Sequence, residues 1–291
     1  KMTNSNSWIK PYEIRINSSL ESLLPKDKSI LSEAIRYSVL NGGKRLRPLL
    51  VYLSSELGTS SEVAQDSVSC AVELIHCYSL IHDDLPSMDD DSLRRGLPTC
   101  HKKYGEAVAI LAGDAIQPLA YNSLTSCKDI EDKIKVKLIS LLANACGQEG
   151  MVRGQILDLT NENSSSIEEL DLMHSKKTGS LIQACLEMGG LLSKLAANEI
   201  DLLSSYGKKI GLAFQIRDDI IDIESPTEIS GKTQGSDLEQ HKMTYPQLIG
   251  MENSKIRAKE LCLEAKEIAI NLSGNTDKLV KLSSFISKRN Y

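Results

Sequence analysis

The sequence is poor in aromatic residues and in long apolar runs. Phe, Trp and Tyr together make up 4% of the 291 residues, so Leu, Ile, Val and Ala must fill the core, for which the 41% hydrophobic content is ample. No run of about 18 apolar residues occurs, and we therefore expect no insertion into a membrane. The first residues contain no apolar signal region, and Lys1 before Met2 is typical of a tag remnant.

The chain also lacks the cysteine spacing of a zinc site or a disulfide framework. Its seven cysteines include no CxxC pair and are odd in number, which fits reduced thiols in a cytoplasmic protein. The net charge of -5 argues against a general nucleic-acid binder. We therefore expect no nucleic-acid partner, and basic residues should matter locally.

No segment alternates apolar and polar residues as a half-buried strand does, and no internal repeat is present. Nearly every segment instead has the period of a helix. We expect a single all-α domain over residues 1–291, a bundle of roughly ten or more helices, with residues 1–8 flexible or partly tag-derived. The expected helices are 11–24, 28–40, 48–57, 62–84, 106–126, 130–146, 149–160, 167–174, 178–194, 198–224, 245–272 and 275–288.

Acidic residues crowd the end of the predicted 62–84 helix. Five aspartates fall within DDLPSMDDD at residues 83–91, and two arginines follow. Carboxylates this close repel one another unless a cation neutralises them. Oxygen ligands suit Mg²⁺, which usually lies between carboxylates and substrate phosphates, and arginine forks bind such phosphates. A solvated acidic turn is the alternative, which the apolar lead-in at 78–82 disfavours.

The spacing within this first acidic motif is unusual for a shared site. Asp83 and Asp89 are six residues apart, about 600° around an ideal helix, and so do not share a face. Pro86 lies between them and cannot donate to the His82 carbonyl. A distortion at Leu85-Pro86 would swing Asp89 back, and we predict that both aspartates face one ion cluster.

A second acidic motif lies in FQIRDDIIDIE at residues 214–224. Asp218 and Asp222 are four apart and point from one helix face, among isoleucines. A carboxylate pair in such surroundings is unfavourable unless it faces a metal or a water-filled cavity. For this motif alone, an exposed stripe on an amphipathic helix is the alternative.

Basic residues precede the helix that is expected to begin at Pro48, a residue suited to a first turn. Lys44 and Arg47 are candidates for binding one diphosphate, because the helix dipole and backbone donors favour an anion there. A solvated basic cap is the alternative. His76 is seven residues before Asp83 and near the same face, although an isolated histidine is more often a packed residue.

Further candidates lie downstream. Lys177 and Thr178 offer an ammonium and a hydroxyl, unless Thr178 is an ordinary N-cap. Gln215 is three residues before Asp218 on the same side, or is simply a packing amide. Lys232 and Lys242 lie in or beside the loop-like residues 225–244, and each is weak evidence alone.

Together these motifs resemble those of the trans-isoprenyl diphosphate synthases, most closely the bacterial farnesyl diphosphate synthases. Two aspartate-rich motifs with GGKRxRP and KTG in the expected order are a specific signal, and the resemblance covers nearly the whole chain. The resemblance implies a helical bundle around a deep cavity, usually a homodimer. The matching segments are GGKRLRP at 42–48, ELIHCYSLIHDDLPSMDDDSLRRG at 73–96, GMVRGQILDL at 150–159, KTGSLI at 177–182, FQIRDDIID at 214–222, GKTQGSD at 231–237 and HKMTYP at 241–246.

The resemblance implies a head-to-tail condensation of isopentenyl diphosphate with dimethylallyl or geranyl diphosphate. It gives farnesyl diphosphate and pyrophosphate, and pyrophosphate is the implied proton acceptor. Two or three Mg²⁺ ions, for which Mn²⁺ can substitute, would be the cofactors. The implied metal ligands are Asp83, Asp89 and Asp218, with support from Asp84 and Asp222.

The same resemblance assigns the other candidates. Thr178 and Gln215 would offer oxygens to the allylic cation. The allylic diphosphate would be bound by Arg94, Lys177 and Lys232, with Lys242 nearby. The isopentenyl diphosphate would be bound by Lys44, Arg47, His76 and Arg95. Two departures from the family pattern are Ser92, where many relatives have an acid, and Ser236, where many have a lysine.

Product length depends on the residues that precede the first motif. Tyr78 lies five residues before Asp83, about 7.5 Å deeper along the helix, and Ser79 lies one turn before it. A bulky ring there would form the floor of the cavity and stop growth at fifteen carbons, unless Tyr78 packs away from the cavity.

Three other functions are alternatives to the synthesis of farnesyl diphosphate. The most similar is that of a geranylgeranyl diphosphate synthase, which has the same chemistry and a deeper cavity. A terpene cyclase is disfavoured by GGKRLRP and Arg95, because it does not need an isopentenyl site. A regulatory prenyl synthase subunit is disfavoured by the two intact acidic motifs.

Overall fold

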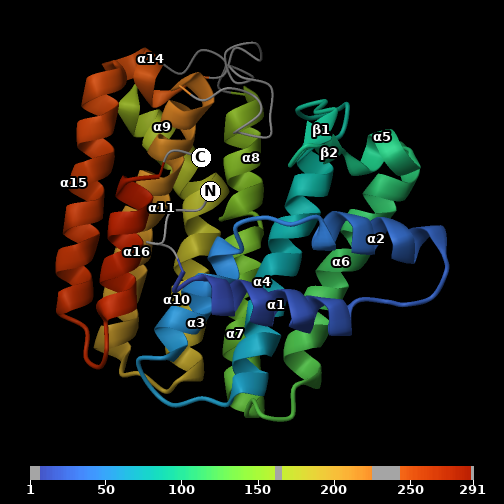
Figure 1. The fold of residues 1–291 in the computed structure, drawn as a ribbon, viewed down its shortest axis with the longest axis horizontal. Coiled ribbons are helices and arrows are strands. Elements are labelled where there is room, and N and C mark those ends of the chain that lie inside the picture. Colours follow the sequence, from blue (N-terminus) through green and yellow to red (C-terminus); the bar gives the residue numbers. More distant parts are fainter. Residues whose placement is uncertain (1–6, 161–165, 225–242, 290–291) are drawn as a thin grey trace.

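The computed structural model describes residues 7–160, 166–224 and 243–289, which are almost entirely helical (Figure 1). The all-α prediction is confirmed. The helices are α1 (Lys10–Leu23), α2 (Ile30–Leu40), α3 (Leu46–Ser55), α4 (Glu62–Asp83), α5 (Cys100–Tyr104), α6 (Glu106–Ser126), α7 (Asp132–Cys146), α8 (Met151–Thr160), α9 (Ile167–His174), η2 (Ser175–Gly179), α10 (Ser180–Leu192), α11 (Ala197–Glu224), α14 (Tyr245–Ile249), α15 (Met251–Ile270) and α16 (Asp277–Ser287).

Most predicted helices are confirmed, but the bounds of two of them were wrong and a few short elements were not predicted. The helix expected over 245–272 is split, because Gly250 has a φ of +81° and ends α14 before α15 begins. α3 begins at Leu46, so Pro48 lies inside its first turn rather than at its start. A short antiparallel hairpin, β1 (Leu93–Arg94) and β2 (Leu97–Pro98), and the one-turn α5 were not expected. Pro118 lies inside α6 without breaking it.

The longer helices stand roughly upright side by side, and α1 and α2 lie across them (Figure 1). α4 packs against α6, and α11 packs against α10 and α15. Start signals are readable in the sequence: the Ser61 side chain accepts a hydrogen bond from the Ala64 amide and so caps α4. α4 and α11, which contain the two acidic motifs, thus run through the same bundle.

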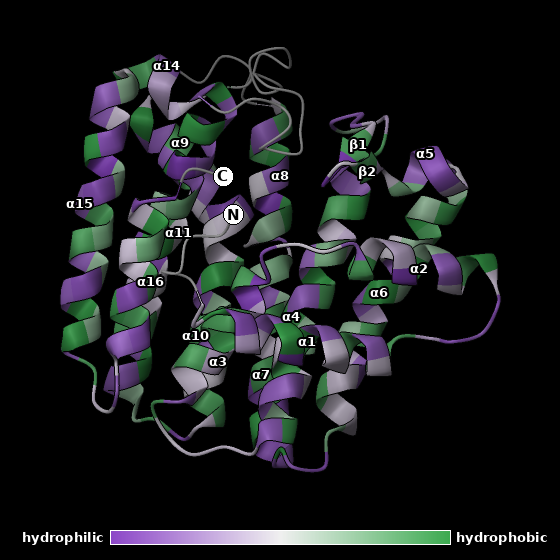
Figure 2. Cartoon of the chain, viewed as in Figure 1, coloured by the Kyte–Doolittle hydropathy of each residue, from purple (hydrophilic) through white to green (hydrophobic). Residues whose placement is uncertain are grey.

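The core is aliphatic, as the composition predicts. Outer helices such as α15 and α16 carry both apolar and polar residues, so that one face of each can pack inward (Figure 2). The exceptions to the aliphatic pattern are three fully buried tyrosines, Tyr52, Tyr206 and Tyr245. All seven cysteines are buried, and none is paired in a disulfide in the structure.

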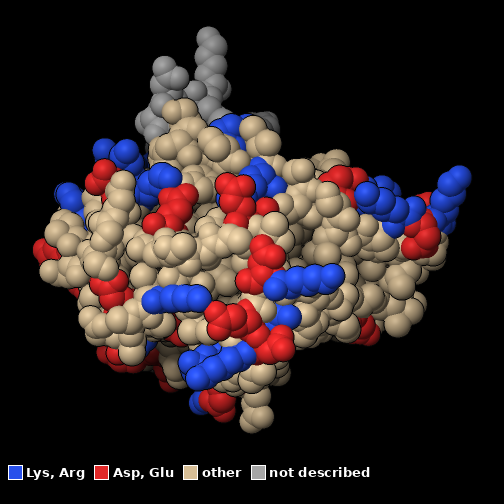
Figure 3. All heavy atoms as spheres, turned by 90° about the horizontal axis from the view of Figure 1, so that it is seen from below, with Lys and Arg blue, Asp and Glu red and all other residues tan. Residues whose placement is uncertain are grey.

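The surface gives no sign of a strongly charged face on the side shown in Figure 3. Acidic and basic side chains are interspersed there over the helices. Among the described residues, no helix is long and apolar enough to cross a bilayer.

Candidate active site

A cavity of about 440 Å³ opens between α3, α4, α8, η2 and α11. Most of the predicted site residues line it, although they come from segments far apart in the sequence. Lys232 and Lys242 lie outside the described residues. The predicted residues that line the cavity are Lys44, Arg47, His76, Asp83, Asp89, Arg94, Arg95, Lys177, Thr178, Gln215, Asp218 and Asp222.

The first acidic motif reaches the cavity because α4 ends at Asp83. The chain then turns, and the Asp89 amide donates a hydrogen bond to the Asp83 carbonyl over 2.9 Å. Asp90 follows in the left-handed region with a φ of 49°. Asp83 and Asp89 therefore line the same cavity despite their six-residue spacing. The distortion predicted at Leu85-Pro86 is a helix end followed by a turn.

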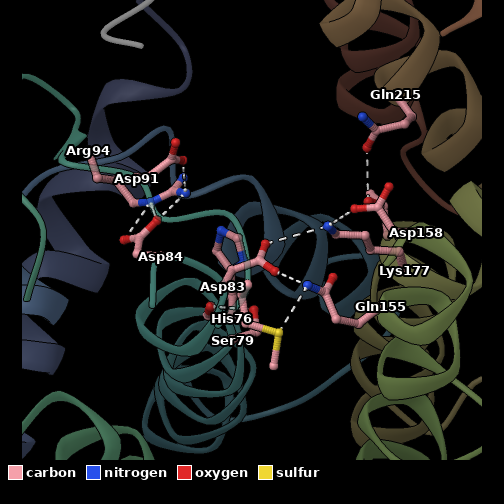
Figure 4. A network of polar contacts seen from close by, with 12 residues as sticks. His76, Ser79, Asp83, Asp84, Asp91, Arg94, Gln155, Asp158, Lys177 and Gln215 are labelled. Carbon is pink, nitrogen blue, oxygen red and sulfur yellow. Dashed lines mark hydrogen bonds and ion pairs between the residues drawn. The ribbon is translucent and has the colours of Figure 1, made fainter. Parts of the chain in front are cut away.

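Asp83 is held by side chains from the other side of the cavity (Figure 4). The Gln155 amide of α8 donates to its Oδ1. The Lys177 Nζ lies 3.5 Å from its Oδ2 and 2.6 Å from the Oδ2 of Asp158, also on α8. Gln155 and Asp158 were missed as site residues. Their shared helix face, three residues apart within GMVRGQILDL, was the available signal.

Asp84 is turned away from this group. It is buried and does not line the cavity, although it was predicted to support a metal. Its carboxylate accepts hydrogen bonds from Arg94, at 2.7 Å from Nε and 2.5 Å from Nη2. Arg94 also reaches Asp91 at 3.3 Å (Figure 4). The arginine fork is thus fixed in one orientation with part of its edge facing the cavity.

The segment with Lys177 and Thr178 is a π-helical turn between α9 and α10, not a helix start. The N-cap alternative for Thr178 was therefore wrong. A Cβ at Gly154 would overlap the Lys177 backbone, so glycine permits the close approach of α8. The Thr178 hydroxyl donates to the Gln215 Oε1 over 2.9 Å. A π turn is a frequent feature of functional sites, because it redirects side chains from a continuous helix.

The second acidic motif lies within uninterrupted α11, and Asp218 and Asp222 both line the cavity. The exposed-stripe alternative was therefore wrong. Arg289, near the end of the chain, places its Nη1 2.6 Å from the Asp218 Oδ1. Its guanidinium lies 4.3 Å from the centre of the Phe214 ring. Arg289 was also missed, because its proximity to α11 is a tertiary contact with no local signal.

The basic residues line the same cavity. Burial and the nearby Arg289 charge lower the pKa of Lys44 to about 8. Burial also lowers the pKa of Arg47, whose Nε has no hydrogen-bond partner within the described ranges. An arginine keeps its proton nevertheless, so a buried and only partly satisfied guanidinium is ready to bind an anion.

His76 and Arg95 complete this group. Burial and the arginines around it hold the pKa of His76 well below its usual value, so the imidazole is neutral. The Arg95 Nη1 donates to the Gly42 carbonyl over 2.5 Å. Gly43 has a φ of 111°, and a Cβ there would collide with the Arg95 guanidinium. These contacts place two guanidinium groups and a neutral imidazole on one wall.

The aspartates fit a hard cation that shares its shell with a ligand. Asp83 and Asp89 lie at the end of α4, and Asp218 and Asp222 lie on α11. Within the described residues, no group of three or more acidic, histidine or cysteine side chains converges on one point. Mg²⁺ typically binds through one or two carboxylates, waters and phosphates rather than in an all-protein cage. The donor set therefore suits Mg²⁺ together with a diphosphate.

Tyr78 and Ser79 do not line the cavity. Tyr78 is buried, and its ring packs edge-on against His82 with the ring centres 5.8 Å apart. The Ser79 hydroxyl donates to the His76 carbonyl over 2.8 Å. A role for Tyr78 in limiting product length stays a prediction.

Comparisons with known proteins give consistent results. The polyprenyl synthetase family model matches residues 28–278. Farnesyl diphosphate synthase of Escherichia coli is 44% identical over 274 residues, 92% of each chain, and geranylgeranyl pyrophosphate synthase 12 of Arabidopsis thaliana is 42% identical over 96% of this chain and 81% of its own. A crystal structure of Helicobacter pylori geranyltransferase, complexed with magnesium and isoprenyl diphosphate, superposes with a TM-score of 0.85 at 34% identity, covering 98% and 97% of the two chains.

Proposed function

The chain belongs to the polyprenyl synthetase family, and we propose that it is a prenyltransferase that makes farnesyl diphosphate. It condenses isopentenyl diphosphate with an allylic diphosphate, dimethylallyl or geranyl, and releases pyrophosphate. The observation that carries this function is one cavity lined both by two aspartate pairs and by a basic wall of Lys44, Arg47, His76 and Arg95. A terpene cyclase needs no such second anion wall.

The allylic diphosphate lies between the two acidic motifs. Arg94 and Lys177 face this part of the cavity and donate to its phosphate oxygens. Asp83, Asp89 and Asp218 would hold Mg²⁺, which when bound would supply positive charge to offset that of the diphosphate and the departing pyrophosphate. Because negative charge develops on the leaving oxygen, donors fixed in advance stabilise the transition state more than the ground state. Lys232 and Lys242, outside the described residues, would add cations here.

Isopentenyl diphosphate lies on the basic wall. Lys44, Arg47 and Arg95 supply charge, and the neutral His76 supplies a hydrogen bond without further repulsion. The two substrates are thereby held side by side, which removes most of the entropic barrier to carbon–carbon bond formation.

The allylic carbon carries positive charge after the carbon–oxygen bond breaks. The Thr178 hydroxyl donates its hydrogen bond to the Gln215 Oε1, so that the hydroxyl lone pairs can face that charge. The double bond of isopentenyl diphosphate attacks, and the proton that is then lost goes to pyrophosphate. His76 is a poor acceptor, because the surrounding arginines oppose a further positive charge.

We also propose that two or three Mg²⁺ ions bind, that Mn²⁺ substitutes, and that the chain forms a homodimer within the cytoplasm. α6 exposes two neighbouring apolar side chains, Ile110 at 43% and Leu111 at 57%, as a self-association face would. Light scattering of the purified chain tests the dimer.

The seven free thiols suit the reducing conditions of the cytoplasm. One buried core that runs from Ile9 to Ile286 supports a single domain.

One assay tests the function. Purified protein is incubated with Mg²⁺, isopentenyl diphosphate and geranyl or dimethylallyl diphosphate, and products are sized by chromatography. We expect a fifteen-carbon product and stoichiometric pyrophosphate, both abolished by a chelator and restored by Mg²⁺ or Mn²⁺. Absence of pyrophosphate release would contradict a synthase. A twenty-carbon product would contradict only the assigned chain length, in favour of a geranylgeranyl diphosphate synthase.

A further inference from the structure

Arg45 lies between two candidate diphosphate ligands in the sequence but has a different environment. All three residues line the cavity, but Arg45 is only 3% exposed, and its guanidinium bonds to acceptors on neighbouring helices. Its backbone is in the left-handed region, with a φ of 48°, at the N-cap of α3. This conformation is unfavourable for a residue with a Cβ, so surrounding contacts must hold it in place.

Those contacts join three helices. The Arg45 Nε donates to the Asn17 Oδ1 of α1 over 3.0 Å, and Nη2 donates to the Val39 carbonyl of α2 over 2.8 Å. Nη1 pairs with the Glu73 Oε1 of α4 over 2.7 Å, and both side chains are 2% exposed. A planar guanidinium can satisfy three acceptors in different directions, whereas a lysine ammonium on a flexible stem cannot do so with the same geometry.

Glu73 connects this anchor to the basic wall. It lies one turn before His76 on α4 and lines the cavity. Its charge favours the protonated forms of Arg47 and Arg95. Its second oxygen, Oε2, is buried with no hydrogen-bond partner in the part of the chain that the structure describes. A single buried carboxylate therefore offsets the repulsion between guanidinium groups that would otherwise lie together uncompensated.

The loop before α3 needs such an anchor. Gly42 and Gly43 both have positive φ values, 67° and 111°, so residues 42–45 make no regular helix of their own. The loop is tied from outside by Arg95 and from inside by Arg45. A shift of this loop would displace Lys44 and the start of α3, but Asp83, Lys177 and Asp218 belong to other elements.

We propose that Arg45 and Glu73 form a buried positioning pair that holds Lys44 and Arg47 in place for isopentenyl diphosphate. The pair touches no reacting atom and acts through the loop. This inference rests on the proposed function, and it adds two residues that select for one of the two substrates. Loss of the pair should weaken isopentenyl diphosphate binding while the allylic site remains intact.

The test uses Arg45→Lys and Glu73→Gln, with Arg36→Lys as the matched control. Arg36 also pairs with a glutamate, Glu21, but at the surface of α1 and α2. We expect the KM for isopentenyl diphosphate to rise about tenfold or more in both variants, because a small misplacement of binding groups is amplified. The kcat and the KM for geranyl diphosphate should stay within about twofold, and the control should match the wild type.

The double variant tests the coupling. If Arg45 and Glu73 act as one unit, combining the two substitutions should raise the KM for isopentenyl diphosphate no further than the worse single variant. If the two increases in KM instead multiply in the double variant, Arg45 and Glu73 act independently and the proposed pair is overturned. Melting temperatures are recorded for every variant. If both KM values rise together while kcat and the melting temperature fall, the role of the pair is merely structural and the inference is overturned.

Two further measurements keep the result decisive. If Arg45→Lys does not fold, Asn17→Ala removes one of the three contacts and should raise the same KM about twofold to threefold. Calorimetric titration with isopentenyl diphosphate measures binding without turnover. A wild type that binds but does not turn over contradicts the proposed function while the variants still test the pair. A wild type that neither binds nor turns over overturns both.

Discussion

The two acidic motifs reach one cavity by different means. Asp83 and Asp89 lie at a helix end, where a turn outside α4 returns the second carboxylate through a backbone hydrogen bond. Asp218 and Asp222 lie on continuous α11 and face the cavity because they are four residues apart. The first arrangement depends on a turn, and the second depends only on the helical period.

The partners of the two motifs also differ. Asp83 is held by Gln155 and Lys177, which belong to the neighbouring α8 and η2. Asp218 pairs with Arg289, which follows α16 at the far end of the described chain. A cation that binds Asp218 must therefore compete with a guanidinium, whereas the partners of Asp83 are an amide and a more distant ammonium. The motifs should differ most in how they respond to the metal.

The largest effect is expected from removing one carboxylate charge in each motif. Asp83→Asn and Asp218→Asn should each lower kcat/KM by about 10³-fold, because each would remove a direct ligand of the charge that stabilises the leaving group. Steady-state kinetics at several Mg²⁺ concentrations measures this. Asp90→Asn is the control, since Asp90 belongs to the same stretch but does not line the cavity, and it should stay within about threefold. Equal losses in all three variants would contradict the assignment.

The two helices should also differ in how an aromatic residue one turn or more before each motif affects the product. Tyr78 precedes the motif on α4 by five residues, and Phe214 precedes the motif on α11 by four. If the Tyr78 ring limits chain growth, Tyr78→Ala should yield products longer than fifteen carbons. Phe214→Ala should change the rate but not the product length, because Phe214 lies beneath Arg289. Chromatography of the products distinguishes the two, and unchanged length in Tyr78→Ala would exclude it as the floor.

A smaller effect is expected at Asp84, the member of the first motif that turns away. Asp84→Asn removes the nearest charged partner of Arg94 and leaves only the longer contact to Asp91, so the KM for geranyl diphosphate should rise about tenfold. The Mg²⁺ concentration for half-maximal activity should remain unchanged. A rise in that concentration, without a change in KM, would make Asp84 a metal ligand instead.

The pH dependence should reflect Lys44. Its pKa is lowered to about 8, so the free enzyme loses this positive charge as the pH rises through 8. The kcat/KM for isopentenyl diphosphate should therefore fall above pH 8, while kcat falls only at higher pH because the bound diphosphate raises the pKa again. Lys44→Arg keeps its charge and should remove the decline. A decline that persists in that variant would assign it to another group.

The smallest effect is expected at Arg289. Arg289→Gln frees Asp218 from its ion pair, so half-maximal activity should require about threefold less Mg²⁺. The pKa of Lys44 should also rise, because a neighbouring positive charge is removed, and the pH at which kcat/KM declines should move upward. Lys288→Gln, an exposed neighbour, is the control. An unchanged Mg²⁺ requirement would mean that the pair does not compete with the metal.

Sequence alone predicts those parts of the site that follow from a local period. Asp218 and Asp222 share a face because they are four apart, and His76 aligns with Asp83 after two turns. The helical period alone does not predict the position of Asp89. It required the additional argument that Pro86 interrupts the helical hydrogen bonds, and the turn after α4 does bring Asp89 back to Asp83.

The remainder depends on tertiary contacts or on unusual backbone. Arg289 approaches Asp218 from another element, which no local pattern encodes. Arg45 and Lys44 are adjacent, and no local pattern predicts the left-handed φ of Arg45 or its contacts with α1, α2 and α4. Thr178 looked like a helix start because π turns have no sequence signature that separates them from caps.

The seven buried thiols provide a built-in reporter of how the chain opens. Burial raises the pKa of several of them, Cys77 and Cys185 to about 12, so the reactive thiolate is scarce at neutral pH. A thiol reagent can therefore react only when the bundle separates locally or unfolds. Cys77 lies next to His76 on α4, whereas Cys127 follows α6 and does not line the cavity. Labelling rates at individual cysteines can be measured by mass spectrometry with and without substrates. They would show which helices open less often when substrates occupy the cavity.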